Sequence, residues 1–442
     1  MSFCRCIKKT VTDWAKEIGF IKRSRKLCAF NFLNLMTFGQ LGMKLPSLAA
    51  MSDALSAKIT REGLHYKFNE KSVEFMEKGF SFALKQKVQG AEKLDIELLN
   101  PFTRVKIIDS SSWKVNPALK DILPGSGGSA SEAACKIQLS YELKSGTVNF
   151  CEVMPGRSND QGYCSFLAEQ IEEGELSIAD LGYFSLNKFR SITIKKAFFI
   201  SRFRPSTALF ATDSLKRINL IETLKQHKGN NYQADIIMGA GNINVPCRLI
   251  CQRVPEHEVN KRRRKLKRGA QRRGHASPSK DSRFFCNWLL LITNIPNAIL
   301  STEKVWALYR VRWQIELLFK QFKSVLRMHQ SNTKNKYRLF CELYGKLIIA
   351  VLTHQIHGAI NSLLWNAQQR ELSFEKFWKR LQERAFTVMQ LLFKSFKQAI
   401  EYLTNEIQSL LFNCLKLKQR SRPTSLEKLL SQENICFETL KI

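Results

Sequence analysis

Acidic residues are scarce in this chain relative to basic ones. Its 442 residues include 38 Asp and Glu against 70 Lys and Arg, which gives a formal net charge of +32. A charge of that size says little about the fold, but its field concentrates polyanions near the surface. A nucleic acid is therefore the favoured partner, and an anionic membrane surface is the competing one.

Long uninterrupted apolar runs are also lacking. The most apolar stretches, NWLLLITNIP and KLIIAVLTHQIHGAI, are too short or too interrupted by His and Gln to span a bilayer. The first residues do not show the basic, apolar and small-residue pattern of a signal peptide. We therefore expect a soluble, cytoplasmic protein that does not use a membrane.

Cysteine pairs of the CxxC type are absent, although the chain has 12 cysteines. The close pairs Cys4–Cys6 and Cys247–Cys251 lack the second pair of ligands that a structural zinc site needs. His354 and His357 are one helical turn apart on an apolar segment, and no third ligand follows nearby. These spacings predict reduced thiols and histidines that belong to the core or to polar networks.

The hydrophobic period divides the chain into five parts. They are a helical N-terminal region (1–98), a strand-rich core segment (99–204), a β-rich basic segment (205–285), a second core segment (286–370) and a helical C-terminal region (371–442). The basic segment contains the run KRRRKLKRGAQRRG, 261–274. Such a run is solvated or disordered, or it binds a polyanion, and in this basic chain we favour nucleic-acid contact.

Two carboxylates close apolar strands in the first core segment. TRVKIIDSSSWKV predicts a strand that ends at Asp109, and ELSIADLGYFS predicts a short buried strand that ends at Asp180. Between them PGSGGSASEA predicts a flexible loop, and CKIQLSYELKSGTVNFCEVMP predicts two strands around the turn 144–146. A helix precedes Asp180, and KKAFFISRFR is a further strand. An Asp at a strand end also has an ordinary role in turns.

The N-terminal region is basic at KRSRK, 22–26, and holds a loose pattern of two short helices. LPSLAAMSDALSAKITREGLHYKF predicts a turn near Ala57 and a second helix that starts at the N-cap Thr60 and projects Arg61. The pattern is compatible with a helix-turn-helix, but other helical hairpins share it.

The stretch YRVRWQIELLFKQFK, 309–323, predicts a helix with two faces. At about 100° per residue, Tyr309, Arg312, Glu316 and Lys323 share an arc of about 60°, apart from an apolar stripe. That stripe consists of Val311, Ile315, Leu318, Phe319, Phe322, Val325 and Leu326. The charged residues have an ordinary interpretation as i,i+4 pairs on a solvated helix.

Three carboxylates could meet if the strand ends and this helix lie on one edge of a sheet. Asp109, Asp180 and Glu316 would repel one another unless divalent cations held them. Mg²⁺ suits oxygen ligands and keeps waters for phosphate substrates, and two such ions can promote phosphodiester cleavage. The residues therefore favour metal-dependent phosphoryl chemistry.

The spacing of Tyr309, Arg312, Glu316 and Lys323 resembles the YREK signature of insertion-sequence DDE transposases of the insertion-sequence-4 group. Four further segments resemble that family: TREGLHYKF (60–68), IIDSS (107–111), IADLGYF (178–184) and LLLITNIP (289–296). The resemblance covers roughly residues 20–370. It implies an α/β fold in which a ribonuclease-H-like mixed sheet is flanked by helices and interrupted by a β-rich insertion, with helical N- and C-terminal regions.

The resemblance also implies roles for individual residues. Asp109, Asp180 and Glu316 would bind two Mg²⁺ or Mn²⁺ ions and carry catalysis. The residues that would contact DNA are Tyr309, Arg312, Lys323, Trp288, Arg262, Arg263, Arg264 and Arg61. Trp288 is the candidate for stacking on a flipped base, and a core tryptophan is its alternative.

The implied activity is cut-and-paste transposition of an insertion sequence. Water would hydrolyse a strand at the element end, and the freed 3′-hydroxyl would then attack the opposite strand and later the target. The partners would be double-stranded DNA and a second copy of the chain, in the cytoplasm of a bacterium near its nucleoid. The alternatives are an inactive or co-opted DNA-binding derivative and a junction-cutting nuclease on the same fold.

Overall fold

The computed structural model describes residues 2–21, 27–43, 47–55, 59–86, 88, 91–127, 131–272, 274, 277–324, 326–331 and 333–416. The basic segment 22–26 and the expected turn near Ala57 lie outside these residues. The chain forms two compact units. The first consists of the described residues of Met1–Asp95, Ser110–Ser158 and Ile315–Gln419, and the second of those of Ile96–Asp109 and Asn159–Gln314.

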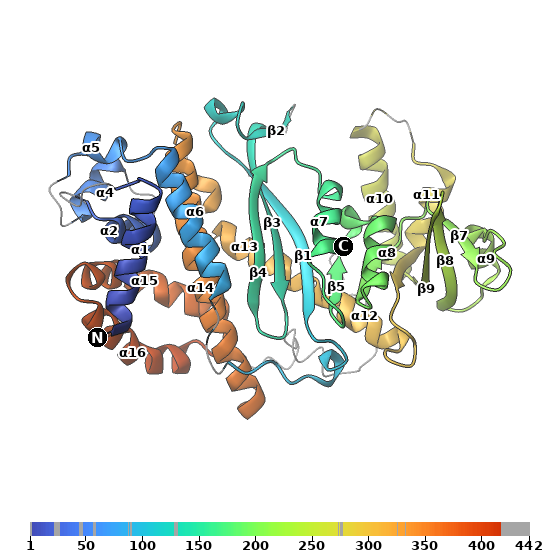
Figure 1. Cartoon of the computed structure of the whole chain (residues 1–442). Helices are drawn as coiled ribbons and strands as arrows, with labels where there is room; N and C mark the ends of the chain where they lie inside the picture. The colour runs from blue at the N-terminus through green and yellow to red at the C-terminus, as the bar shows by residue number, and fades with distance from the viewer. Residues whose placement is uncertain are drawn as a thin grey trace. The chain divides into compact units, whose positions relative to one another are not determined.

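A mixed β-sheet is organised around strand β1 (Val105–Lys114), shown in Figure 1. The strand order is β2-β3-β1-β5-β6-β10-β9-β8-β7, with β4 paired to β3. Strand β1 pairs in parallel with β5 (Leu176–Ala179), and β5 pairs in parallel with β6 (Phe198–Arg202). The expected mixed sheet of a ribonuclease-H-like core, flanked by helices, is therefore confirmed.

Strand β1 is longer than the sequence pattern predicted. It pairs with β5 only as far as Ile108 opposite Ala179, but it continues to Lys114, so Asp109 ends a pairing and not a strand. The strand continues because its other neighbour in the sheet is β3 (Ser131–Glu142), which satisfies further backbone groups.

A hairpin follows β1 in the first unit. Strands β3 and β4 (Thr147–Pro155) pair antiparallel as predicted, and Gly146 closes their turn with φ +67°. The predicted flexible loop is instead ordered at both ends. Its first residues form the short strand β2 (Pro124–Gly127), which pairs with the start of β3, while residues 128–130 lie outside the described part.

The sequence pattern missed helix α8 (Leu186–Ile194), which connects β5 to β6. Parallel neighbours cannot be joined by a tight turn, so a crossover of this kind is required. Its Phe189 and Ile192 are buried in the core of the second unit. The helix predicted before Asp180 is shorter than expected and consists of η4 (Gln161–Tyr163) and α7 (Cys164–Glu169).

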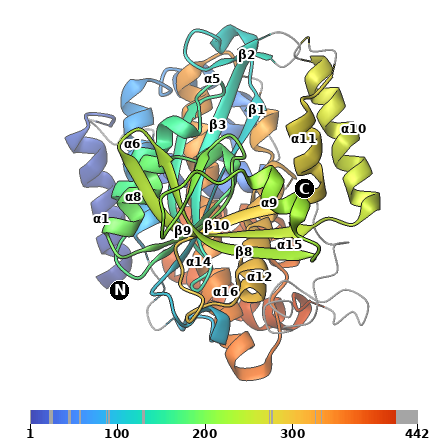
Figure 2. The same cartoon turned by 90° about the vertical axis from the view of Figure 1, so that its right-hand side faces the viewer.

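The expected β-rich segment extends the sheet of the second unit. Its elements are β7 (Ala208–Ala211), α9 (Leu220–Gln226), β8 (Asn231–Ala240), β9 (Ile243–Arg253), α10 (Glu256–Arg272) and α11 (Lys280–Phe284). Figure 2 shows β8 and β9 beside β10 (Trp288–Thr293), which is fully buried as predicted. The basic run is largely helical, because its residues 261–272 form most of α10.

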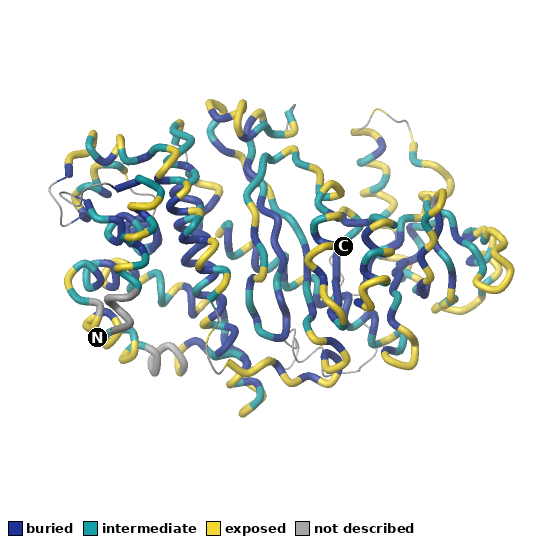
Figure 3. The backbone as a smooth tube through the Cα atoms, in the orientation of Figure 1, coloured by how far each residue is buried: buried dark blue, intermediate teal, exposed yellow. Residues whose placement is uncertain are grey.

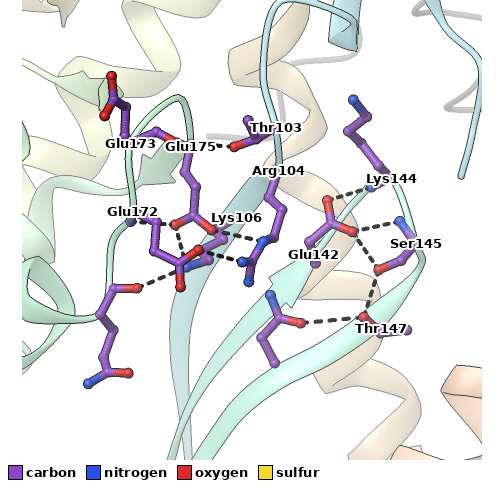
Figure 4. A network of polar contacts seen from close by, with 12 residues as sticks. Thr103, Arg104, Lys106, Glu142, Lys144, Ser145, Thr147, Glu172, Glu173 and Glu175 are labelled. Carbon is purple, nitrogen blue, oxygen red and sulfur yellow. Dashed lines mark hydrogen bonds and ion pairs between the residues drawn. The ribbon is translucent and has the colours of Figure 1, made fainter. Parts of the chain in front are cut away.

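A buried carboxylate anchors the strand ends opposite Asp109 and Asp180. Glu175 has a side chain that is 1% exposed, and it lies between Lys106 Nζ at 2.5 Å and Arg104 Nε at 3.0 Å (Figure 4). It also accepts the backbone N–H of Glu172 at 2.9 Å. The contact with Arg104 Nε is an ion pair without hydrogen-bond geometry, since Glu175 Oε1 has no hydrogen-bond partner. Opposite charges thus compensate this buried group.

Helices dominate the first unit. They are α1 (Ser2–Glu17), α2 (Ala29–Asn34), the π-helical η1 (Leu35–Gly39), α3 (Gln40–Met43), α4 (Leu48–Ala54), α5 (Arg61–His65), α6 (Glu70–Lys85), α13 (Trp313–Ser324, in this unit from Ile315), α14 (Lys336–Gln368), α15 (Phe374–Lys394) and α16 (Phe396–Asn413). The last two agree with the helical C-terminal region that the sequence predicted as far as the described residues extend.

Helix α14 is the central helix of the first unit. The sequence pattern predicted an apolar stretch too short or too interrupted to span a bilayer, whereas the whole helix of 33 residues is long and apolar enough by length and composition alone. It is, however, mostly buried by protein, including α6 and η1, as Figure 3 shows. Such burial is typical of the core helix of a globular unit.

Of the two histidines of α14, His354 is buried in the core and His357 is partly buried and bonded to the backbone, which agrees with the predicted core or polar-network roles. The His354 ring stacks on Phe374 with 3.9 Å between centroids, and His357 Nε2 lies 3.1 Å from the Leu372 carbonyl oxygen. Burial lowers the pKa of His357 to about 4. The cysteines that the structure describes with their side chains are free, which agrees with the predicted reduced thiols.

Candidate active site

Asp109 and Asp180 occupy equivalent positions on neighbouring parallel strands. The last residue pair in the register of β1 and β5 is Ile108 with Ala179. Each aspartate immediately follows one member of that pair, and both are only partly buried. The apolar strands therefore bring the two carboxylates to one edge of the sheet, as the sequence predicted.

One guanidinium and one phenol of the second unit contact these carboxylates. Arg312 Nη1 lies 3.4 Å from Asp109 Oδ2, and the two side chains are 16% and 21% exposed. The Tyr309 hydroxyl donates to Asp180 Oδ1 over 3.5 Å, which is long for a hydrogen bond. Burial, and then the charge of Asp180, raises the pKa of Tyr309, so its hydroxyl stays protonated. Four of the predicted site residues are thus brought together.

Arg202 is a residue of this site that the sequence pattern missed. In the register of β5 and β6, Ala179 lies opposite Ser201, so Arg202 is the strand-end residue in line with Asp180. Its positive charge acts on Tyr309, whose pKa it lowers against the stronger effect of burial. The signal was present in KKAFFISRFR, because aligning its strand end with ELSIAD places a cation next to the second aspartate.

Glu316 and Lys323 lie on α13, in the part of that helix that belongs to the first unit. Both are partly buried, and burial lowers the pKa of Lys323. The apolar stripe behaves as predicted, since Ile315, Leu318 and Phe322 are all buried. Val325 falls outside the described residues.

The stretch 309–323 is not one continuous α-helix, contrary to the prediction. Helix α12 (Thr302–Val311) ends and α13 begins on either side of Arg312, whose N–H bonds to the Tyr309 carbonyl three residues back at 3.2 Å. A uniform rotation of 100° per residue therefore does not hold across Arg312. The break falls where the Arg312 guanidinium contacts Asp109, and the sequence has no Gly or Pro there to predict it.

The donor set of the two aspartates suits a hard divalent cation. Two partly buried carboxylates offer the oxygen ligands that Mg²⁺ prefers. Within the described residues, no three His, Cys, Asp or Glu side chains form a group that could hold a metal ion.

Trp288 lies in the core of the second unit, which is the alternative that the sequence left open. Its side chain is 2% exposed, and the Arg253 guanidinium lies over its ring at 4.9 Å from the centroid. A flipped base could stack on this ring only if the side chain left the core. The strand that carries it is buried along its whole length.

The three arginines of the basic run have different surroundings on α10. Arg262 Nη1 donates to the Trp288 carbonyl oxygen at 2.9 Å, and burial lowers its pKa to about 10. Arg263 Nη2 donates to Asn287 Oδ1 at 3.2 Å, although its side chain is largely exposed. Arg264 is exposed and faces a groove in the same unit.

Arg61 is exposed at the first position of α5 and forms an ion pair with Glu62 at 2.9 Å. Thr60 is the N-cap, as predicted, and accepts the Gly63 N–H at 3.1 Å. Helix α5, however, has only five residues. One turn is too short to place several side chains along a major groove, so a helix-turn-helix recognition helix is not formed here.

Comparison with known proteins places the site in a family context. Residues 100–352 match the family model described as "Transposase DDE domain", which includes both aspartates and the segment 309–323. The chain is similar to the "Transposase for insertion sequence element IS231F" of Bacillus thuringiensis subsp. israelensis, with 30% identity over 92% of this chain and 88% of that protein.

Two further similarities extend this picture. The "Transposase for insertion sequence element IS1151" of Clostridium perfringens is 28% identical over 92% of this chain and 89% of its own length. Among solved structures, a piggyBac transposase synaptic complex with hairpin DNA aligns with a TM-score of 0.47 and 12% identity, over 91% of this chain and 82% of that chain.

Proposed function

This chain belongs to the DDE-domain transposase family, and from that premise we propose that it moves an insertion sequence by cut-and-paste transposition. It would hydrolyse a DNA strand at each end of the element and then use the freed 3′-hydroxyl as the nucleophile for strand transfer. The observation that supports this proposal best is the register of β1 and β5, which aligns Asp109 with Asp180.

Asp109, Asp180 and Glu316 are the proposed catalytic carboxylates. They would hold two Mg²⁺ or Mn²⁺ ions, which supply activation of the attacking oxygen and stabilisation of the leaving oxygen in phosphodiester cleavage. The contact of Arg312 with Asp109 compensates that carboxylate's negative charge in the protein without metal, which keeps the partly buried acid tolerable.

Tyr309, Arg312 and Lys323 are proposed to position the DNA backbone at the cleavage site. Arg312 can donate to phosphate oxygens in a planar, bidentate manner, and the protonated Tyr309 hydroxyl is a further donor. Lys323 adds a third cationic or polar donor on the adjoining helix. The five-part division of the chain, with a DNA-binding N-terminal region and a dimerising C-terminal region, also stays a proposal.

The proposed partners follow from this activity. They are double-stranded DNA, both at the inverted-repeat ends of the element and at the target, and a second copy of the chain in the DNA complex. The proposed location is the bacterial cytoplasm at the nucleoid. The net charge of +32 supports a polyanionic partner.

Substitution of Glu316 tests the proposal. Glu316→Gln should leave binding to element-end DNA intact but abolish Mg²⁺-dependent cleavage, because the amide keeps the shape and removes the charge of the ligand. The readouts are an affinity measurement and a nicking assay on labelled end DNA. Glu303→Gln on α12 is the matched control, since Glu303 is exposed and should not affect cleavage.

Cleavage by Glu316→Gln at the wild-type rate would refute the assignment of this residue. The main alternative is a DNA-binding protein that has lost catalysis. It predicts that the wild-type chain binds end DNA but produces no nick in Mg²⁺ or Mn²⁺, so the same assay separates the two functions.

A further inference from the structure

A basic groove lies in the second unit beside the candidate active site. Its volume is about 1460 Å³, and its walls are formed by α10, by the segment from β6 to α9, and by residues around α11. Nine of its lining residues are Lys or Arg, and one, Asp281, is acidic. Such an imbalance produces a strong local positive potential within a concave surface.

One face of α10 supplies most of this charge. Lys261, Arg264, Lys265, Arg268 and Arg272 all line the groove. At 100° per residue these five positions fall within an arc of about 100°. The helix also carries Arg263 and Lys267, which are exposed but do not line the groove. The basic run is therefore divided into a groove face and an outer face.

The chain segment from β6 to α9 lines the groove with further cations. Arg204 and Arg217 line it, and the Arg204 guanidinium lies 5.1 Å from the centroid of the Phe184 ring. Small polar side chains, including Ser206 and Thr207, lie between them. Cations combined with hydroxyl groups are typical of contacts to phosphate oxygens rather than to base edges.

Arg202 connects the groove to the candidate active site. It lines the groove, and it is in strand register with Asp180 through the pairing of Ala179 with Ser201. Its charge acts on Tyr309 on one side and on Arg262 of α10 on the other. Two residues of the groove lining, Leu181 and Arg202, are therefore immediate neighbours of Asp180 in sequence or in strand register.

We propose that this groove binds the phosphate backbone of the DNA segment adjoining the phosphodiester bond that is cut. The proposal rests on the proposed function, and it assigns phosphate contacts to Arg204, Arg217, Lys265, Arg268 and Arg272. The concave shape cannot lie flat against a bilayer, which argues against the membrane as partner. Contacts of this kind hold the DNA in register without reading its sequence.

Charge-neutral substitutions on the two faces of α10 test the inference. Lys265→Gln and Arg268→Gln should each weaken binding of element-end DNA and lower the slope of log affinity against log salt by about 0.9, because each loses one phosphate contact. Lys267→Gln is the matched control, with the same change in net charge on the outer face. The dissociation constants are measured between about 50 and 200 mM salt, and thermal melting confirms that each variant is folded.

A Lys267→Gln control that keeps the wild-type slope while the groove variants lose about 0.9 each would support the groove. Equal changes on both faces, or no change in the groove variants, would overturn it. The nicking assay on the wild-type chain separates this result from the proposed function. Loss of affinity without any wild-type cleavage would refute catalysis and leave the groove, whereas normal cleavage with unchanged groove variants would refute the groove alone.

Discussion

Each aspartate of the candidate site has a different partner, although the two strands place them equivalently. Asp109 faces the permanent cation of Arg312, whereas Asp180 faces the neutral hydroxyl of Tyr309. Arg312 is a permanent cation because a guanidinium stays charged at any physiological pH. When DNA and metal ions bind, we expect the Arg312 guanidinium to exchange its contact with Asp109 for a contact with a phosphate oxygen.

Arg312 is therefore expected to matter for DNA positioning more than for folding. Arg312→Ala should lower kcat/KM for strand transfer by about 10- to 150-fold, which corresponds to the loss of one charge-assisted hydrogen bond of about 1.5–3 kcal/mol. Arg312→Lys should recover only part of this loss, because an ammonium cannot bind a phosphate in a bidentate manner. The measurement is strand transfer with pre-cleaved end DNA.

Lys323→Ala should show a smaller decrease in the same assay, since it removes a point charge rather than a bidentate donor. Undiminished strand transfer in both Arg312→Ala and Lys323→Ala would count against their role at the phosphate. Unchanged unfolding of both variants in urea shows that the effect is on function.

The strands and the hairpin were predictable from the sequence because their apolar residues alternate or run continuously. Four features were not. Strand β1 passes beyond Asp109 because β3 lies beside it, and that pairing depends on the tertiary structure rather than on the local sequence. Helix α8 has a weak apolar period, and the break at Arg312 occurs without Gly or Pro. The alignment of Arg202 with the aspartates also depends on register, which no single segment contains.

Helix α14 depends on one glycine for its close approach to η1. A Cβ at Gly345 would overlap the Met36 carbonyl oxygen and lie 2.6 Å from the Met36 carbonyl carbon. Backbone atoms cannot move aside as a flexible side chain can. Gly345 therefore permits a backbone contact that any other residue would prevent.

Gly345→Ala is expected to lower the free energy of unfolding by about 1–3 kcal/mol through overpacking, despite the better helix propensity of alanine. Gly79→Ala on α6 is the matched control. Its Cβ would meet Ile348 Cδ1 at 3.6 Å, an ordinary contact, so that variant should be neutral or more stable by up to about 1 kcal/mol. Urea unfolding measures both, and equal stability of the two variants would contradict the packing described.

At the scale of the whole molecule, the positively charged side chains are unevenly distributed. The net charge of +32 predicted a polyanion but not where it binds. The folded chain gathers nine cations around one groove. Arg262 is one of them and also bonds to the backbone of β10, whereas Arg263 contacts Asn287 and does not line the groove. Sequence composition thus identified the class of partner, and the fold determines which residues of the basic run can reach it.

The family and the mixed sheet could be predicted from sequence motifs. Whether the three carboxylates meet depends on how distant segments of the chain are arranged. Asp109 and Asp180 are aligned by strand register, but Glu316 follows them by more than 130 residues on a helix. The central claim is that these three side chains share metal ions, and it can be tested by direct observation.

The most direct measurement is an experimental structure of the chain bound to element-end DNA and Mn²⁺, with anomalous scattering to locate the ions. We expect two ions about 4 Å apart, held by Asp109, Asp180 and Glu316 beside the scissile phosphate. Ions held by other residues, or a Glu316 carboxylate outside ligand distance of any ion, would contradict it.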